Sequence, residues 1–343
     1  MADTIKNITA TEILNSKGDT TIEVTMTSEN GKEAKASVPQ GVSTGKHEAK
    51  YIDTQEAISK TGQTIKFVLG GKDPTKQNEI DDILIKEDGT ERKSKLGANS
   101  ILGASLACAR LGAKIKKQFL WQHLAGLYTG NTTPNFPKLV INMIEGGVHS
   151  KSGLIFQEYW IVPKTKNIKK STEIGTQLYQ ALGKYFNKNG DLQGNEAGDE
   201  GGFTPQLEDD LEPFTIISNV AIQEGIRNQI DLGLDAAATN ISLDSTKLNE
   251  MYHTMENNFG IKYTEDPFNE EDFESFAKLK KELKDVVIIG DDLTVTNISR
   301  MKVAHEKDSI SGIIIKPNQI GTLTETLEAI NKAREYNWQV IIS

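Results

Sequence analysis

The feature that most constrains this chain is a series of short apolar runs that each end in a polar or charged residue. The runs are Ile230–Asp235 (IDLGLD), Ile261–Glu265 (IKYTE), Val286–Asp291 (VVIIGD), Ile313–Lys316 (IIIK) and Val340–Ser343 (VIIS). Successive ends lie about 25–30 residues apart, and amphipathic stretches such as 271–283 and 322–336 separate them. A strand and a crossover helix need about this much chain before the next parallel strand. The second part of the chain is therefore predicted to repeat a strand–helix unit.

Charged residues at the ends of buried strands favour a (β/α) barrel for this part of the chain. In such barrels the active site lies at the carboxyl ends of the strands, so polar residues collect there. An open parallel sheet would also produce apolar runs and is the alternative architecture. We expect the barrel.

The first part of the chain has the pattern of strands followed by helices. Residues 20–28 (TTIEVTMTS) alternate, Asn30-Gly31 forms a turn, and residues 33–38 return, which predicts a hairpin. Asp73-Pro74 indicates the start of a helix that runs toward Ile85. The Ala- and Leu-rich stretch 98–127 is also predicted to be helical.

A break in this periodicity at residues 131–137 (NTTPNFP) is the expected domain boundary. The length of 343 residues also favours two domains, because single cores stop growing at about 250–300 residues. We expect an α+β N-terminal domain over residues 1–130 and a barrel domain over residues 135–343.

Composition excludes several classes of function. The net charge of −9 argues against a nucleic-acid or anionic-membrane binder, since no basic excess can neutralise phosphates. Cys108 is the single cysteine, so no intramolecular disulfide can form, and a reduced cytoplasmic setting is expected. The N-terminus lacks a signal-peptide pattern, and no run of about 18 apolar residues predicts a membrane span.

Three carboxylates end successive predicted strands: Asp235, Glu265 and Asp291. In a barrel these ends converge, and three acids so close together would repel one another unless a cation joined them. Oxygen ligands without Cys or His favour Mg²⁺ over Zn²⁺. The alternative is that each is an ordinary acid of a surface loop, which the regular spacing of the strands disfavours.

Lys316 ends the next predicted strand and should lie in the same barrel mouth. Partial burial near a metal ion could lower its pKa and let it act as a base, or it could form a salt bridge to the acids.

Two glycine-containing loops are further candidates for contact with a ligand, GDEGGF around Glu200 and GGVH around His149. Taken alone, each loop has the composition of a common turn.

Seven segments, in this order along the chain, resemble motifs of the enolase family. They are STGKHEA (Ser43–Ala49), KSKLGANSILG (Lys93–Gly103), QEY (Gln157–Tyr159), GDEGGF (Gly198–Phe203), EDPF (Glu265–Phe268), GDDLTVTN (Gly290–Asn297) and KPNQIGTLTE (Lys316–Glu325). The resemblance implies a TIM-like (β/α) barrel behind an α+β domain. It also implies a glycolytic, cytoplasmic, Mg²⁺-dependent hydro-lyase that acts on 2-phospho-D-glycerate as a homodimer or higher homo-oligomer.

The resemblance also implies roles for individual residues. Lys316 would take the C2 proton, a Lys base beside Mg²⁺ being characteristic of the enolase superfamily. Glu200 would be the general acid, with Glu158 assisting. Asp235, Glu265 and Asp291 would hold Mg²⁺, and Ser43 would reach a second Mg²⁺ when its loop closes. The residues lining the substrate pocket would be Ser43, His149, Gln157 and Glu158.

The chain departs from the family pattern at several positions. Lys17 stands where Arg is usual, which puts the usual dimer contact in doubt, and Gln40 replaces a Ser before the Ser43 loop. Glu145 replaces Asn before Gly146-Gly147 and adds an acid near the pocket. The segment 195–197 (NEA) replaces a small, apolar run.

The family pattern continues beyond the residue that corresponds to Ser343, with a His-Arg-Ser-Gly-Glu motif and a strand carrying Lys. Those Arg, Ser and Lys residues bind substrate, so we expect an incomplete barrel, a fragment of an enolase, and no activity from the fragment itself. A catalytically dead binding or scaffold relative is the alternative, disfavoured by the retained Lys316 and Glu200. A racemase or cycloisomerase of the superfamily is disfavoured by the STG and GDEGG segments.

Overall fold

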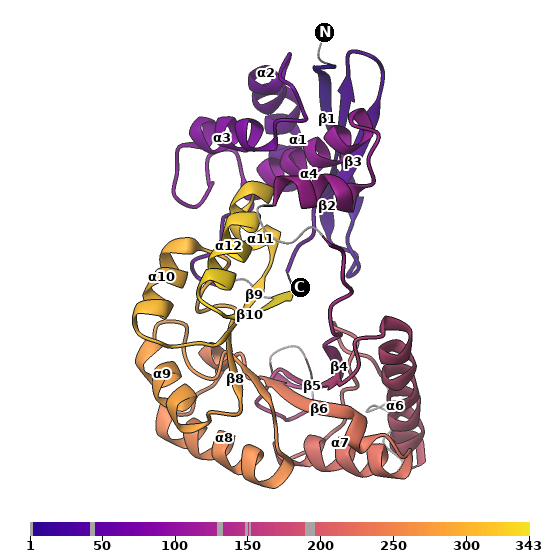
Figure 1. Ribbon diagram of the computed structural model, residues 1–343, viewed down its shortest axis with the longest axis vertical. Coiled ribbons are helices and arrows are strands. Elements are labelled where there is room, and N and C mark those ends of the chain that lie inside the picture. Colours follow the sequence, from indigo (N-terminus) through magenta and orange to yellow (C-terminus); the bar gives the residue numbers. More distant parts are fainter. Residues whose placement is uncertain (1–2, 42–44, 129–132, 148–149, 151, 189–195) are drawn as a thin grey trace. The chain divides into compact units, whose positions relative to one another are not determined.

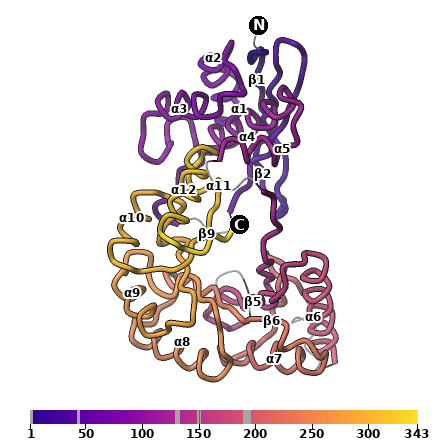
Figure 2. Tube along the Cα trace, in the orientation of Figure 1, coloured from indigo at the N-terminus to yellow at the C-terminus, as the bar shows by residue number. Residues whose placement is uncertain are grey.

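The computed structural model describes residues 3–41, 45–128, 133–147, 150, 152–188 and 196–343. The chain forms two compact units, and Figures 1 and 2 show the elements of each along the sequence. The first unit comprises residues Met1–Thr133, Val295–Met301 and Ile314–Ser343, and the second comprises Pro134–Thr294 and Lys302–Ile313.

The first unit contains a three-stranded antiparallel sheet and the helices that cover it. Its elements are β1 (Ile5–Leu14), β2 (Thr20–Ser28), β3 (Glu33–Ser37), α1 (Thr54–Lys60), the π-helical segment η1 (Thr61–Ile65), α2 (Lys66–Leu69), α3 (Gln77–Asp88), α4 (Ala98–Ile115), α5 (Leu120–Leu127), α11 (Pro317–Ile320), α12 (Leu323–Glu335) and β10 (Gln339–Ile342).

The sheet order is β1-β2-β3, and the predicted hairpin of β2 and β3 is confirmed. Gly31 in its turn has a φ of +77°, which glycine adopts without steric cost. Strand β1 pairs with β2 from Ile5↔Ser28 to Leu14↔Thr20 and was not predicted.

Helix α4 packs against this sheet at very short range. A Cβ atom added to Gly103 would lie 2.4 Å from Cγ2 of Val24 on β2, so the helix approaches the strand only because glycine stands there. The predicted start of α3 was wrong: the Asp73 carboxylate accepts from the backbone N–H of Thr75 in a separate turn, and the helix begins at Gln77.

Helix α12 joins the N-terminal residues of the first unit through buried polar contacts. The Lys93 ammonium lies 2.9 Å from a carboxylate oxygen of Glu325. The buried Asp81 carboxylate accepts from the backbone N–H of Thr324 (2.9 Å) and from its hydroxyl (2.6 Å). Residues separated by more than two hundred positions are therefore fixed within one unit.

The second unit contains most of a curled mixed sheet and its outer helices. Its elements are β4 (Ile141–Glu145), β5 (Glu158–Pro163), α6 (Ile168–Lys188), α7 (Glu212–Gln223), η3 (Arg227–Gln229), β6 (Ile230–Asp235), η4 (Ala238–Asn240), α8 (Ser245–Phe259), β7 (Tyr263–Glu265), α9 (Phe273–Glu282) and β8 (Val287–Gly290). Helix α10 (Ile298–Glu306) and strand β9 (Gly312–Ile315) have residues in both units.

The strand order of this sheet is β10-β9-β8-β7-β6-β5-β4. The predicted strands are all present as β6 to β10, and those from β6 to β9 pair in parallel as expected. Strand β5 differs, because it runs antiparallel to both β4 and β6. Helices α6 to α9 lie outside the curl of the second unit's strands (Figure 1), as expected for part of a barrel. No helix in the described ranges is long and apolar enough to cross a membrane.

Candidate active site

A row of carboxylic acids runs along one edge of the sheet in the second unit. The last residues of β4, β6 and β7 are acids, and so is the residue after β8. Because β5 is antiparallel, its first residue joins the same edge. The row consists of Glu145, Glu158, Asp235, Glu265 and Asp291.

The register of the strands places the members of this row next to one another. Glu158 is the strand partner of Glu145 on one side and of Asp235 on the other. Asp235 is the partner of Glu265 across the parallel pair β6 and β7. Neighbouring strands lie about 4.8 Å apart, so this edge concentrates negative charge.

The three predicted metal ligands, Asp235, Glu265 and Asp291, thus end at one edge of one sheet. Asp235 is buried, and its carboxylate accepts from the Gln157 side-chain amide (3.1 Å) and from the backbone N–H of Ala237 (2.9 Å). Such bonds orient a carboxylate before any ion binds. The role of the three as ligands remains a prediction.

Asp266 is an acid at this edge that the sequence analysis did not single out. It is buried, and its carboxylate accepts from the backbone N–H groups of Asp291 (3.0 Å) and Asp292 (2.6 Å). Carboxylate oxygens of Asp266, Asp291 and Asp292 lie within 4.8 Å of one another and could hold a metal ion. The only sequence signal was the Asp-Pro step immediately after the predicted strand end.

Burial raises the pKa of Asp266 well above its ordinary value, and the charges of Asp292, Asp291 and Asp235 raise it further. A divalent cation would relieve this repulsion, and a donor set of oxygens alone suits Mg²⁺. The residues present therefore fit a hard divalent ion.

Glu158 and Glu200 form a pair of interacting carboxyl groups. Burial raises the pKa of Glu158 well above its ordinary value, the hydrogen bond with Glu200 raises it further, and the charge of Asp235 adds to both effects. Glu200 itself lies in the exposed loop that follows Gly198. The structure thus brings together the two residues predicted to provide the acid.

Gln157 lines a cavity of about 280 Å³ in the second unit, together with Gly147, Leu154, Ala236, Ala237 and Asn240. Its side-chain oxygen is buried and has no hydrogen-bond partner within the described part of the chain. An unpaired buried acceptor beside a cavity is available to a ligand. Ser43 and His149, the other predicted pocket residues, lie outside the described residues.

Lys316 follows β9 and belongs to the first unit. Its backbone N–H donates to the Thr296 hydroxyl (2.9 Å), which in turn donates to the side-chain oxygen of Gln319 (2.8 Å). Thr296 and the preceding Val295 have φ values of +55° and +43°, so a strained turn supports the lysine. Since the acidic row belongs to the second unit, the role of Lys316 as base stays a prediction.

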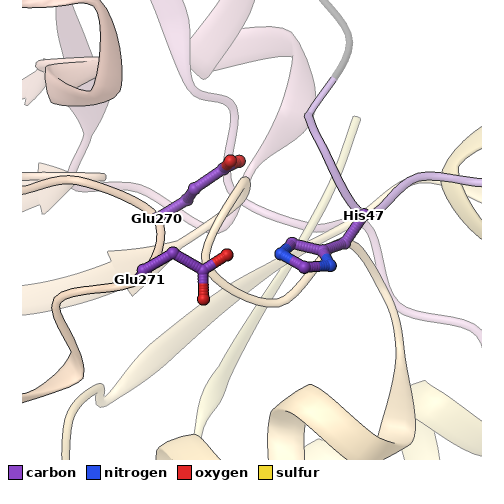
Figure 3. A group of neighbouring side chains, drawn as sticks. All are labelled: His47, Glu270 and Glu271. Atoms are coloured by element: carbon purple, nitrogen blue, oxygen red, sulfur yellow. The ribbon is translucent and has the colours of Figure 1, made fainter.

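Two more acids, Glu270 and Glu271, lie in the loop between β7 and α9 and are drawn as sticks in Figure 3. The backbone N–H of Glu270 donates to the Thr239 hydroxyl, and that of Glu271 donates to the side chain of Asn269, both at 3.0 Å. These bonds stabilise the loop, and neither glutamate belongs to the acidic row.

Family models match nearly the whole chain. The enolase N-terminal domain matches residues 5–124, and the enolase C-terminal TIM barrel domain matches residues 134–343. Among curated relatives, the enolase of Ehrlichia ruminantium strain Welgevonden is 38% identical over 99% of this chain, and that of Solanum lycopersicum is 32% identical over the same share. The enolase of Methanopyrus kandleri is 35% identical over 99% of this chain.

The chain spans 85% of the length of each of these three relatives. The comparisons confirm the resemblance found in the sequence and the expected fold class.

Proposed function

Because the chain belongs to the enolase family, and by family is a phosphopyruvate hydratase, we propose that it performs the Mg²⁺-dependent reversible dehydration of 2-phospho-D-glycerate to phosphoenolpyruvate. The reaction serves glycolysis and gluconeogenesis, which implies a cytoplasmic enzyme. The observation that carries the proposal is the Glu158–Glu200 carboxyl pair beside Asp235 in a row of acids.

The proposed reaction needs a base for the C2 proton and an acid for the C3 hydroxyl. Lys316 is the base, and Glu200 protonates the departing hydroxyl. Glu158 assists by holding a proton on the pair, because a carboxyl with a raised pKa stays protonated closer to neutral pH.

The acidic row supplies the ion-binding part of the proposed site. Asp235, Glu265 and Asp291 would hold Mg²⁺, and the bound ion supplies positive charge where the substrate carboxylate becomes more negative. Gln157 orients Asp235 through its side-chain amide and lines the substrate pocket with Glu158, His149 and Ser43. Ser43 would also reach a second Mg²⁺.

The proposal extends to domain organisation and assembly. We assign residues 1–130 to the N-terminal domain and residues 135–343 to the barrel domain, and we expect a homodimer or higher homo-oligomer of the family type. The substrate is a small molecule.

Two activities, measured on the chain extended by the C-terminal segment of the family pattern, separate the proposed roles of the base and the acid. Lys316→Ala should abolish both the exchange of the C2 proton with solvent and the dehydration of 2-phosphoglycerate. Glu200→Gln should retain the exchange and lose dehydration by about 10²–10⁴-fold, since it affects only the later proton transfer. Nuclear magnetic resonance in deuterated water follows the exchange, and phosphoenolpyruvate absorbance follows dehydration.

Matched controls are available for both variants. Lys332→Ala removes a half-exposed ammonium of α12 that pairs with Glu335. Glu196→Gln removes an exposed carboxylate near Glu200 in sequence. Both controls should keep both activities, and equal loss of both activities in Lys316→Ala and Glu200→Gln would contradict the division of roles.

A further inference from the structure

Glu145 is a buried carboxylic acid with three donors on one oxygen. It ends β4 and is 1% exposed. Its Oε1 atom accepts from the backbone N–H groups of Glu200 (3.1 Å) and Gly202 (2.6 Å) and from the side-chain amide of Asn142 (3.1 Å). The residue therefore binds the peptide group that carries the Glu200 side chain.

The loop of residues 198–203 contacts Glu145 at several of its residues. The backbone N–H of Glu145 donates to the Phe203 carbonyl (2.8 Å), and the backbone N–H of Phe203 donates to the Met143 carbonyl (2.9 Å). A Cβ atom at Gly198 would lie 1.9 Å from Oε2 of Glu145, so only glycine fits there. The glycines of this loop make room for the Glu145 carboxyl group.

The buried position of Glu145 is energetically unfavourable for a carboxyl group. Oε2 of Glu145 is buried and has no hydrogen-bond partner within the described residues. Burial raises the pKa of Glu145, and the charges of Glu200 and Asp199 raise it further, although the two backbone N–H donors oppose this. A buried and partly unsatisfied carboxyl group costs stability, so packing alone does not account for it.

We propose that Glu145 is a positioning residue for Glu200, which fixes the loop of residues 198–203 through two backbone amides and so holds the Glu200 carboxyl group against Glu158. The strand register supports this geometry, because Glu145 and Glu158 are direct partners of β4 and β5. Glu145 thus holds the backbone N–H of Glu200 and is also the strand partner of Glu158, the second member of the carboxyl pair. The inference rests on the proposed function, in which Glu200 is the acid.

Two substitutions of Glu145 test the acceptor role. Glu145→Ala leaves two backbone amides and the Asn142 side-chain amide without this acceptor, and it should lower dehydration by about 10²-fold, the effect of misplacing a reacting group by about 1 Å. The exchange of the C2 proton should stay within about threefold of the parent, because that step does not use Glu200. Glu145→Gln keeps an oxygen acceptor of the same reach and should restore dehydration to within about threefold of the parent.

Tyr179→Phe is the matched control for loosening the same loop. It removes the hydrogen bond from the Tyr179 hydroxyl to the Gly201 carbonyl (2.8 Å) and leaves the amides of Glu200 and Gly202 bound to Glu145. This variant should keep dehydration within about threefold of the parent. An equal loss in Tyr179→Phe and Glu145→Ala would show that general loop packing is responsible, and it would overturn the inference.

Amide hydrogen exchange provides a readout that does not depend on activity. The amides of Glu200 and Gly202 should lose protection in Glu145→Ala and keep it in Glu145→Gln. Unchanged protection in Glu145→Ala would overturn the inference. If the parent, extended by the C-terminal segment of the family pattern, showed neither C2 exchange nor dehydration, the proposed function would fail, whereas the protection pattern would still decide whether Glu145 anchors the loop.

Discussion

Replacing Asp266 by alanine should weaken Mg²⁺ binding by about 10–100-fold, the usual effect of losing a group that orients a metal ligand. The Asp266 carboxylate holds the segment after β8 through the backbone N–H groups of Asp291 and Asp292, at 3.0 and 2.6 Å. Without that acceptor, the Asp291 carboxylate loses its fixed direction.

The same substitution should also lower the free energy of unfolding. Each backbone donor left without an acceptor costs about 1–3 kcal/mol when it is buried. Part of that loss is offset, because Asp266 is itself a buried acid with a pKa raised by burial and by neighbouring charges. We expect a net loss of about 2–4 kcal/mol in the absence of metal.

Asp272→Ala supplies the matched control, because it removes a carboxylate that also accepts from a backbone N–H. The Asp272 side chain caps α9 by accepting from the backbone N–H of Ser275 (3.0 Å). Its loss should cost about 0.5–2 kcal/mol and leave Mg²⁺ affinity unchanged. Urea unfolding measures the stability and isothermal titration calorimetry measures the affinity. If Asp266→Ala bound Mg²⁺ as tightly as Asp272→Ala, the anchoring role of Asp266 would be refuted.

Two further predictions concern pH and packing. Burial raises the pKa of Glu158 above its ordinary value of 4.5, so its folded form binds the proton more tightly and its ionisation opposes folding as pH rises. Glu158→Gln should therefore gain stability relative to the parent in urea unfolding as the pH rises above the ordinary value of 4.5, and a pH-independent difference would contradict this. Gly103→Ala should lower the free energy of unfolding by about 1–3 kcal/mol, because the added Cβ would contact Val24. Gly126→Ala in α5, with open space around its Cβ, should cause no such loss. Equal calorimetric melting temperatures of the two variants would argue against the packing constraint.

The strand ends of the second unit could be predicted because each is marked twice in the sequence. An apolar run gives the buried strand, and the acid that stops it marks the carboxyl end of that strand, as at Asp235 and Glu265. In strand β5 the acid is the first residue and not the last, since the strand begins at Glu158. A rule based on the last residue of a strand therefore misses it, and only the family resemblance pointed to Glu158.

Other features depend on backbone geometry that the sequence does not display. Asp266 has a φ of +38°, which turns its carboxylate toward the end of β8, and no periodicity encodes that turn. Asp73 has the chemistry of a helix cap, yet it caps a turn that precedes the helix. Both residues were visible as acids next to proline, but their partners were decided by local conformation.

The first unit is assembled from segments that lie far apart in the sequence, and this affects the order in which the chain folds. Residues Pro134–Thr294 are continuous in sequence and make up most of the second unit, so that part can be complete early in synthesis. The first unit needs Glu325 and Thr324 to meet Lys93 and Asp81, and these contacts close loops of more than two hundred residues. Such closures are slow because chain entropy opposes them. The core of the first unit, which runs from Ile5 to Leu111, contains no residue of the 314–343 segment and can form before that segment is made, so the contacts of Asp81 and Lys93 with α12 close last.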